Sequence, residues 1–370
     1  MVVNRKSSRS IAKRNKKGMN KGKPPSISAC MIVKNEEELL PQCLESIKDV
    51  VHEIILVDTG STDRTIEIAG SYGAKVYHHP WENDFSKHRN QSISYATSDW
   101  IFIIDADEEI SLESRAQLRQ TISNVPPDVS YLYFRVEDKN AGGRVMSVMH
   151  SPRLFRNRMG FKYKNFIHNE LELKGHGDTS NLVLFHHGYH LSPEKMKAKF
   201  ERTTQLLKRR MEEEPDRPEP AFFLCKSYGM EKLNAEAIYY GLITRQKLEE
   251  LRDVSTFFVE IFYIIALSFY RMKMYALAEA TCLEGLKLFP QYIDLYFILS
   301  DICRISGRFQ EAVNHAQQYL RLREFFVDNP KQKKSLVFYT LDYHEQVMSG
   351  LNEIRESAIA KQAAMSGKNP

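Results

Sequence analysis

Between residues 26 and 104, apolar runs of strand length alternate with segments of helical spacing. The apolar runs contain few polar residues, which is typical of strands that are buried on both faces of a sheet. Strands of this kind, separated by helices, predict a parallel, doubly wound α/β sheet. We expect the strands at 27–33, 53–57, 75–78 and 100–104, and the helices at 36–48, 62–70 and 85–96.

The pattern changes twice farther along the chain. Three strand-like stretches, at 131–136, 144–149 and 182–186, predict an antiparallel extension of the first sheet. From Ser192 onward the chain reads as helical, with a first helix at 193–213. Tyr275 and Phe309 recur at a spacing of 34 residues, as do Ala278 and Ala312. This period indicates tetratricopeptide-like helix pairs, and an ordinary helical bundle is the alternative.

The length of 370 residues suits two domains rather than one. Residues 1–23 carry nine Lys or Arg and no acidic residue, whereas the rest carries 43 basic and 47 acidic residues. The positive charge therefore sits in a tail, either solvated or in contact with an anionic partner, and a nucleic-acid-binding body is not implied. We expect a basic disordered tail at 1–25, an α/β domain at 26–190, a helical linker at 191–220, a tetratricopeptide-like domain at 221–350 and a C-terminal tail at 351–370.

The cysteines and the apolar stretches indicate the compartment in which such a chain is found. Five cysteines lie at long spacings without a C-x-x-C pair, which argues against a disulfide framework and against a structural zinc site. The longest apolar stretch, at 257–270, contains Glu260 and is shorter than the ~20 residues that cross a bilayer. We expect a cytoplasmic protein without a membrane span.

Acidic residues follow two of the expected strands. Asp105 and Asp107, separated by Ala106, come directly after the strand at 100–104, and Asp58 follows the strand at 53–57. In open parallel sheets the ligand lies beyond the carboxyl ends of the strands, so these acids are expected at one edge. Carboxylate oxygens suit Mg²⁺ or Mn²⁺ arriving with a diphosphate. No G-x-G-x-x-G follows the first strand and no G-x-x-x-x-G-K-[ST] occurs, which disfavours a dehydrogenase and a P-loop ATPase.

Five stretches taken together resemble the family-2 inverting glycosyltransferases of the GT-A fold: MIVKNEE, EIILVDTGSTD, WENDFSKHRN, DWIFIIDADEE and FIHNEL. The resemblance covers roughly residues 26–190 and implies transfer of a sugar from a UDP-sugar, with Asp107 and Asp105 facing Mg²⁺ or Mn²⁺. It also implies catalytic roles for His168 and Glu170, although Asn169 stands where the family usually has Glu, which leaves the general base open. The nucleotide-sugar site that it implies consists of Val33, Glu36, Asp58, Asp84, Arg89, Asp105 and Ala106.

With its helical part included, the chain resembles cytoplasmic peptide glycosyltransferases that modify bacteriocin precursors. This resemblance implies a peptide or protein acceptor, and a homodimer through the helical domain is a further option. Glycans of the cell envelope are the alternative acceptors, because other two-domain members of the family act on them. A non-enzymatic repeat scaffold with a vestigial nucleotide fold is the alternative from another class, against which the intact Asp105-Ala106-Asp107 speaks.

Overall fold

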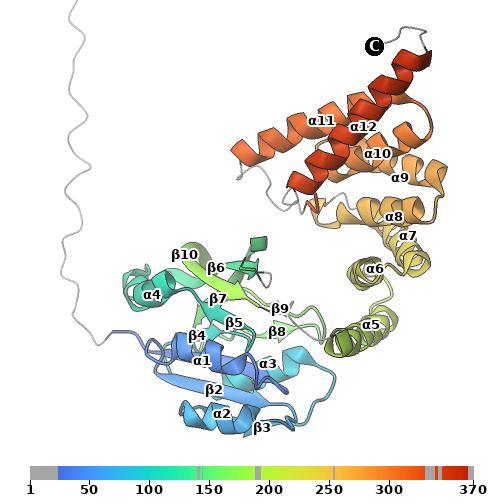
Figure 1. Ribbon diagram of the computed structural model, residues 1–370. Helices are drawn as coiled ribbons and strands as arrows, with labels where there is room; N and C mark the ends of the chain where they lie inside the picture. Colours follow the sequence, from blue (N-terminus) through green and yellow to red (C-terminus); the bar gives the residue numbers. More distant parts are fainter. Residues whose placement is uncertain are drawn as a thin grey trace, which may run out of the picture. The chain divides into compact units, whose positions relative to one another are not determined.

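The computed structural model describes residues 24–139, 142–143, 145–187, 193–252, 255–329, 338–340 and 344–365. The chain forms two compact units (Figure 1). The first, which we call the sheet unit, contains residues up to 188 except two short segments. Those segments, 83–85 and 165–169, belong with the chain from 189 onward to the second unit, which we call the helical unit.

The sheet unit is built on an eight-stranded sheet whose first four strands run parallel, as predicted. β7 then pairs antiparallel with β4 and with β6, which confirms the antiparallel extension. β10 departs from that pattern because it runs parallel to β6. The spatial order is β3 (Lys75–His78), β2 (Glu53–Asp58), β1 (Ile27–Val33), β4 (Trp100–Ile103), β7 (Val145–Arg156), β6 (Val129–Lys139), β10 (His176–His186) and β5 (Glu108–Ile110).

Helices cover both faces of the central part of this sheet, where β1 and β4 are almost wholly buried. On β1, Met31 packs in one core with Leu44 of α1 (Leu40–Ile47) and Leu118 of α4 (Leu112–Asn124). Cys30, which points to the opposite face, packs in a second core against Ile93 of α3 (Phe85–Ser94). Such two-sided burial is characteristic of doubly wound α/β sheets.

Two predicted helices begin three or four residues later than expected, because local contacts hold their first residues in turns. The helix expected from residue 36 begins at Leu40, because residues 37–39 form a turn after Asn35, whose φ is +57°. The helix expected from residue 62 is α2 (Thr65–Ser71). Asp63 accepts hydrogen bonds from the backbone N–H groups of Thr65 and Glu37, so it joins the start of α2 to the loop after β1. The strand expected at 144–149 starts at Val145, and residue 144 lies outside the described residues.

The helical unit consists of antiparallel helix pairs (Figure 1). α8 pairs with α9 and α10 with α11, as the 34-residue spacing predicts, and α6 with α7 form an earlier pair. The C-terminal tail expected from residue 351 begins inside α12. The helices are α5 (Pro193–Glu213), α6 (Glu219–Met230), α7 (Asn234–Leu251), α8 (Glu260–Arg271), α9 (Tyr275–Leu288), α10 (Ile293–Ile305), α11 (Phe309–Asp328) and α12 (His344–Met365).

The first pair is a repeat unit whose distance from the second is 41 residues instead of 34. Ala237, Ala278 and Ala312 occupy the same place in the second helix of each pair, and none has exposed surface. The turn within each pair contains one residue in the left-handed region, at Lys232, Lys273 and Gly307. Three helix pairs that share close-packing positions and turn geometry form a tetratricopeptide-like array. The longer first spacing explains why a strict 34-residue period shows only two units.

All five cysteines lie in the described part of the chain and are buried free thiols. Among the helices that the structure describes, none is both long and apolar enough to span a bilayer. The basic segment at 1–23 lies outside the described residues.

Candidate functional site

The candidate site lies where strand order reverses, between β1 and β4. Val33 is the last residue of β1, Asp58 the last residue of β2, and Asp105 comes two residues after β4 ends. The backbone N–H of Thr59 donates to the carbonyl oxygen of Val33 at 3.0 Å, which ties the ends of the two strands together. Three predicted residues thus follow adjacent parallel strands, at the place where ligands bind in open α/β sheets.

Asp58 is almost fully buried and is held by the turn that follows it. Its carboxylate accepts hydrogen bonds from the backbone N–H groups of Gly60 and Ser61, at 3.2 and 3.0 Å. His78 at the end of β3 lies 3.3 Å from the same carboxylate. Burial by itself would raise the pKa of Asp58, but these hydrogen bonds lower it, so the side chain is an anion at neutral pH.

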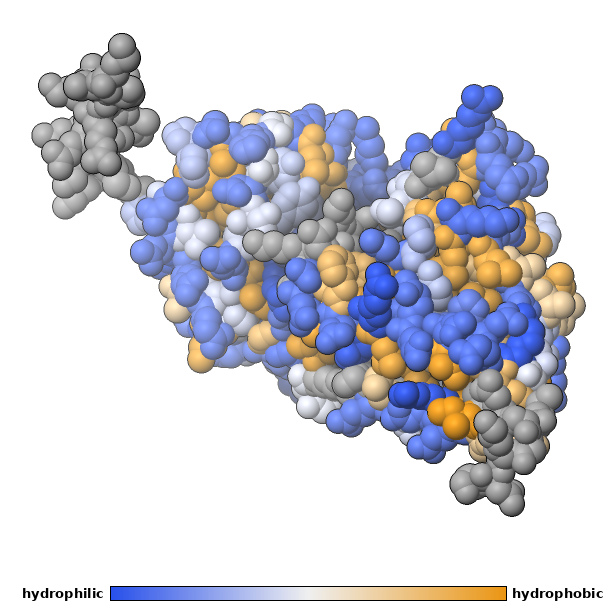
Figure 2. Space-filling model, turned by 90° about the horizontal axis from the view of Figure 1, so that it is seen from above, coloured by the Kyte–Doolittle hydropathy of each residue, from blue (hydrophilic) through white to orange (hydrophobic). Residues whose placement is uncertain are grey.

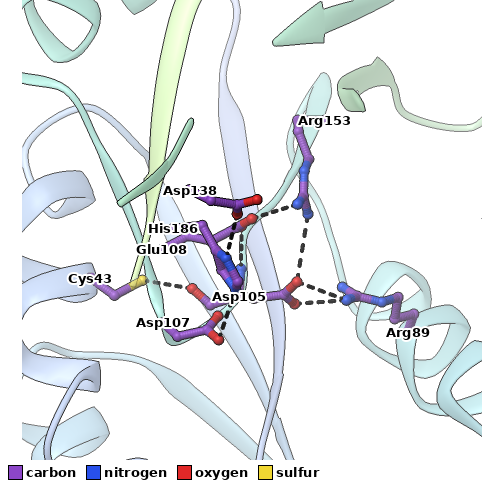
Figure 3. Close-up of polar contacts among 8 residues, drawn as sticks. All are labelled: Cys43, Arg89, Asp105, Asp107, Glu108, Asp138, Arg153 and His186. Atoms are coloured by element: carbon purple, nitrogen blue, oxygen red, sulfur yellow. Dashed lines mark hydrogen bonds and ion pairs between the residues drawn. The ribbon is translucent and has the colours of Figure 1, made fainter. Parts of the chain in front are cut away.

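Asp105 is enclosed by two arginines (Figure 3). Nη2 of Arg89, from α3, donates to both carboxylate oxygens at 2.8 and 2.9 Å, and Nη1 of Arg153, from β7, lies 3.6 Å from Oδ2. Burial opposes ionisation, but part of the side chain stays exposed and the two guanidinium groups lower the pKa of Asp105. Nε and Nη1 of Arg89 have no hydrogen-bond partner in the described part of the chain. Arg89 therefore has donors that the described protein atoms do not use.

Glu108 lies behind Asp105 and has only 2% of its surface exposed. One carboxylate oxygen accepts from Nη2 of Arg153 and the other from the backbone N–H of Asp105, at 2.9 Å. Burial raises the pKa of Glu108 to about 7 against the effect of Arg153, and the charges of Asp105 and Asp107 act in the same direction as burial. Arg153 thus links two carboxylates and is itself only 12% exposed at its side chain.

Asp107 is oriented by a histidine that the sheet register supplies. β10 pairs with β6 on one side and with β5 on the other, which places His186 opposite Asp138 and Glu108. Nδ1 of His186 lies 2.7 Å from Asp138 and Nε2 lies 3.2 Å from Oδ2 of Asp107 (Figure 3). Partial burial opposes protonation, but the hydrogen bonds to both carboxylates raise the pKa of His186 to about 10. His186 therefore carries its proton at neutral pH in this arrangement.

A divalent cation fits Asp107 better than Asp105. The Asp107 carboxylate is 27% exposed and lies beside His186, whose other ring nitrogen is fixed by Asp138. A carboxylate oxygen and an imidazole nitrogen oriented by a second carboxylate are typical metal ligands. Coordination through Nε2 requires the neutral ring and would release its proton. Asp105, by contrast, already has Arg89 on both of its oxygens.

The other predicted residues lie in different surroundings. Ala106 is buried between the two acids, and the backbone N–H of Glu36 donates to Thr65 Oγ1 at 2.8 Å. Glu170 is an exposed residue at the start of β9 (Glu170–Leu171), which pairs with β8 (Tyr163–Lys164). Asp84 and His168 belong to the two short segments of the helical unit.

His168 stacks on Phe223 of α6, with ring centroids 3.7 Å apart and planes 10° from parallel. Loss of hydration in this contact, together with the positive charges of Lys226 and Arg210, lowers the pKa of His168 to about 4. Although the residue keeps exposed surface, its ring is neutral at pH 7 and can accept a proton.

Four residues of the cluster were not identified from the sequence: Glu108, Asp138, Arg153 and His186. Glu108 adjoins the Asp-x-Asp motif and could have been taken with it. His186 ends a predicted strand, and Asp58 follows another. This position at a strand end is the signal for His186, because zinc-ligand spacing does not reveal it. Asp138 and Arg153 carry no local signal, because only the pairing of β6, β7 and β10 brings them to the cluster.

A doubly wound sheet with acids and two largely buried arginines at its switch point has its candidate site where open α/β sheets bind ligands. Residues 28–180 match the family model described as glycosyl transferase family 2. This part of the chain is similar to that family over less than half of the full length, its mostly parallel sheet is of the GT-A type, and a tetratricopeptide-like helical region follows it.

Two curated relatives extend the comparison beyond the sheet unit. A TPR repeat-containing protein of Synechococcus elongatus is 35% identical over 252 residues, which cover 65% of this chain and 61% of that protein. The SPbeta prophage-derived glycosyltransferase SunS of Bacillus subtilis is 30% identical over 235 residues, covering 60% of this chain and 54% of SunS. The matches thus span little more than half the length of these relatives. Among solved structures, MamA aligns with 48% of this chain at a TM-score of 0.32 and 16% identity, a likeness too slight to support any inference.

Proposed function

We propose that the chain is a metal-dependent inverting glycosyltransferase that moves a sugar from a UDP-sugar to a side chain of a peptide or protein. One observation carries the donor half of the proposal. Asp107, partly exposed, shares a cluster with an oriented His186, and two buried arginines lie next to it at the sheet edge. Cationic side chains beside hard metal ligands suit a diphosphate, whose departure with negative charge is the difficult part of sugar transfer.

Each residue of the cluster has a distinct role in this proposal. Asp107 and His186 would hold Mg²⁺ or Mn²⁺, which when bound neutralises charge on the leaving diphosphate. Arg89 keeps Asp105 ionised and places positive charge beside the phosphate oxygens. Asp58, an anion that the turn after β2 fixes in place, suits the N–H of uracil or a ribose hydroxyl.

The reaction itself is a single displacement. The oxygen or sulfur of the acceptor forms a bond to the anomeric carbon while the bond from that carbon to the phosphate oxygen breaks, and UDP leaves with the electron pair. The acceptor proton passes to His168 or Glu170. A neutral imidazole and an exposed carboxylate are both able to accept it.

A donor assay tests the proposal without knowledge of the acceptor. We expect the protein to release UDP slowly from at least one of UDP-glucose, UDP-galactose and UDP-N-acetylglucosamine, because water replaces the missing acceptor. Release with Mn²⁺ should exceed release in EDTA at least ~10-fold, because an unneutralised diphosphate is a poor leaving group. A repeat scaffold with a vestigial nucleotide fold would release no UDP from any of the three, with or without Mn²⁺.

The peptide acceptor rests on the resemblance to peptide glycosyltransferases and on the helical array, since such arrays present extended surfaces that bind peptides. We test it with two flexible peptides that differ only in one Cys or Ser. A thiol, with a pKa of about 8.5, needs less help from a base than a hydroxyl does. Glu170→Gln is therefore expected to remove transfer to Ser and to spare transfer to Cys, as measured by mass spectrometry of the peptides.

His168→Ala, assayed in parallel, shows which residue takes the proton. If His168→Ala removes transfer to Ser and spares transfer to Cys, whereas Glu170→Gln does not, the base is His168. If the wild type and both variants all prefer Ser, the argument from thiol ionisation is wrong. If the protein transfers sugar to an envelope glycan and to neither peptide, the acceptor is a glycan and the peptide proposal is wrong.

We also infer a homodimer through the helical unit. Large apolar side chains that are exposed among the described residues lie mostly in that unit, for example Met274, Leu277 and Leu283. Figure 2 shows apolar residues, in orange, grouped in patches between hydrophilic ones, in blue. Exposed apolar patches mark interaction surfaces, and sedimentation velocity gives the mass that decides between one and two copies.

A further inference from the structure

Two short segments of the chain belong to the helical unit although the sequence on either side of them belongs to the sheet unit. Residues 83–85 lead into α3, the helix that carries Arg89. Residues 165–169 connect β8 to β9 and carry His168. The backbone N–H of Phe85 donates to the carbonyl oxygen of Phe166 at 2.9 Å, which joins one segment to the other.

Arginines of α5 hold these segments from one side. Arg210, only 2% exposed, donates through Nη1 to the carbonyl oxygen of Ile167 at 3.3 Å. The guanidinium carbon of Arg209 lies 4.6 Å from the centre of the Phe166 ring, which is a cation–π contact. Two successive carbonyl groups, of residues 166 and 167, are thereby bound, so the backbone just before His168 is fixed.

α6 holds the side chain of His168 itself. The stack on Phe223 sets the plane of the imidazole ring, while the backbone of His168 has a φ of +47°. This conformation is uncommon for a residue other than glycine, and contacts with its surroundings hold it here. The surroundings here are the backbone bonds of the preceding residues and the aromatic ring of α6.

We propose that Phe223 of α6 and Arg210 of α5 are positioning residues, which hold the segment at 165–169 so that His168 presents its ring to the acceptor half of the reaction. This inference rests on the proposed function for its consequence in turnover, but the packing it describes is testable without turnover.

The charged groups around His168 fit this role. Lys226 of α6 and Arg210 of α5 are the cations that act on the ring, and each is itself paired with an acid, Glu260 and Glu214 respectively. Together with the loss of hydration they keep the imidazole neutral but make it a weaker base than a free histidine, so its contribution depends on where the ring is held. Removing the stack exposes the ring to water and returns its titration toward that of a free histidine.

The test uses the full chain with Phe223→Leu, which keeps apolar volume and loses the aromatic stack, and Phe223→Tyr, which keeps the stack. Proton NMR of the imidazole follows the titration of His168, assigned by its loss in His168→Gln. We expect a midpoint of about 4 in the wild type and in Phe223→Tyr, and a midpoint shifted toward 6.5 in Phe223→Leu. Phe325→Ala, which truncates an exposed phenylalanine on α11, should leave the midpoint unchanged.

Turnover is measured on the same proteins with the Cys and Ser peptides and with UDP release in their absence. We expect Phe223→Leu to lower transfer at least tenfold and to leave UDP release and the KM for the UDP-sugar within twofold, while Phe223→Tyr transfers like the wild type. A His168 midpoint near 6.5 in the wild type would overturn the proposed packing. Equal losses of transfer and UDP release would overturn the positioning role. A wild type that never releases UDP would overturn the proposed function, and the NMR titration would still decide whether the packing of His168 on Phe223 is correct.

Discussion

Replacing Asp107 with Asn is expected to lower Mn²⁺-dependent turnover by about 10²- to 10³-fold, the usual loss when one strong electrostatic stabiliser of a transition state is removed. Asp107 is the acid of the Asp-x-Asp motif that contacts His186, whereas Asp105 and Glu108 are bound by arginines. The amide keeps the shape of the side chain but loses the charge that a divalent cation requires.

The fold should survive this change, because Asp138 still holds His186 and the amide keeps the shape of the Asp107 side chain. We expect a loss of about 1.5–3 kcal/mol in the free energy of unfolding, measured by urea denaturation, because a hydrogen bond between two charged groups is weakened. Asp49→Asn is the matched control, since that carboxylate is exposed and forms a surface ion pair with Arg115. Turnover of Asp107→Asn equal to that of the control would show that the acid does not take part.

Replacing Arg153 with Met is expected to destabilise the sheet unit by about 3–5 kcal/mol, the cost of removing one partner of a buried ion pair. The change leaves Glu108 buried without its cation and takes one of two cations from Asp105. Both tryptophans of the chain, Trp81 and Trp100, lie in the sheet unit, so their fluorescence during urea denaturation reports the unfolding of that unit alone.

A second change separates charge from packing. Arg153→Met combined with Glu108→Gln removes the stranded carboxylate, and we expect it to recover at least half of the lost stability. The loss in Arg153→Met alone should increase as the pH rises from 6 to 9. The pKa of Glu108 is already raised to about 7 in the fold, so its protonated carboxyl stabilises the folded state. That stabilisation is lost as the carboxyl ionises at higher pH, and the variant has no Arg153 to pair with the anion. A pH-independent loss, unchanged by Glu108→Gln, would mean that Arg153 acts through packing alone.

The residues at the sheet edge could be predicted from the sequence because each of them adjoins its strand in the sequence. Two of the first four strands are apolar runs with an acid at or just after their ends, Asp58 and Asp105, and parallel strands bring those acids to one edge without further assumptions. α4 was missed because only Leu118 and Ile122 among its apolar side chains are buried, which is too few to set a helical period. β8 and β9 are two residues each and leave no periodicity at all.

The remainder of the site depends on register between distant strands. His186 contacts Asp107, 79 residues away, because β10 pairs antiparallel with β5, and it contacts Asp138, 48 residues away, because β10 pairs parallel with β6. A strand expected to run antiparallel gives no reason to place these three residues together. The stack of His168 on Phe223 could not be predicted from local sequence either, because it depends on which unit the segment at 165–169 packs with.

The central claim, that Asp107 and His186 provide a cation site for a UDP-sugar, is tested most directly by calorimetric titration of UDP into the protein. With the wild type, UDP should bind at least ~10-fold more tightly in Mn²⁺ than in EDTA, and Asp107→Asn should abolish that difference. Binding that is equally tight in Mn²⁺ and in EDTA, or a Mn²⁺ effect that survives in Asp107→Asn, would contradict the account.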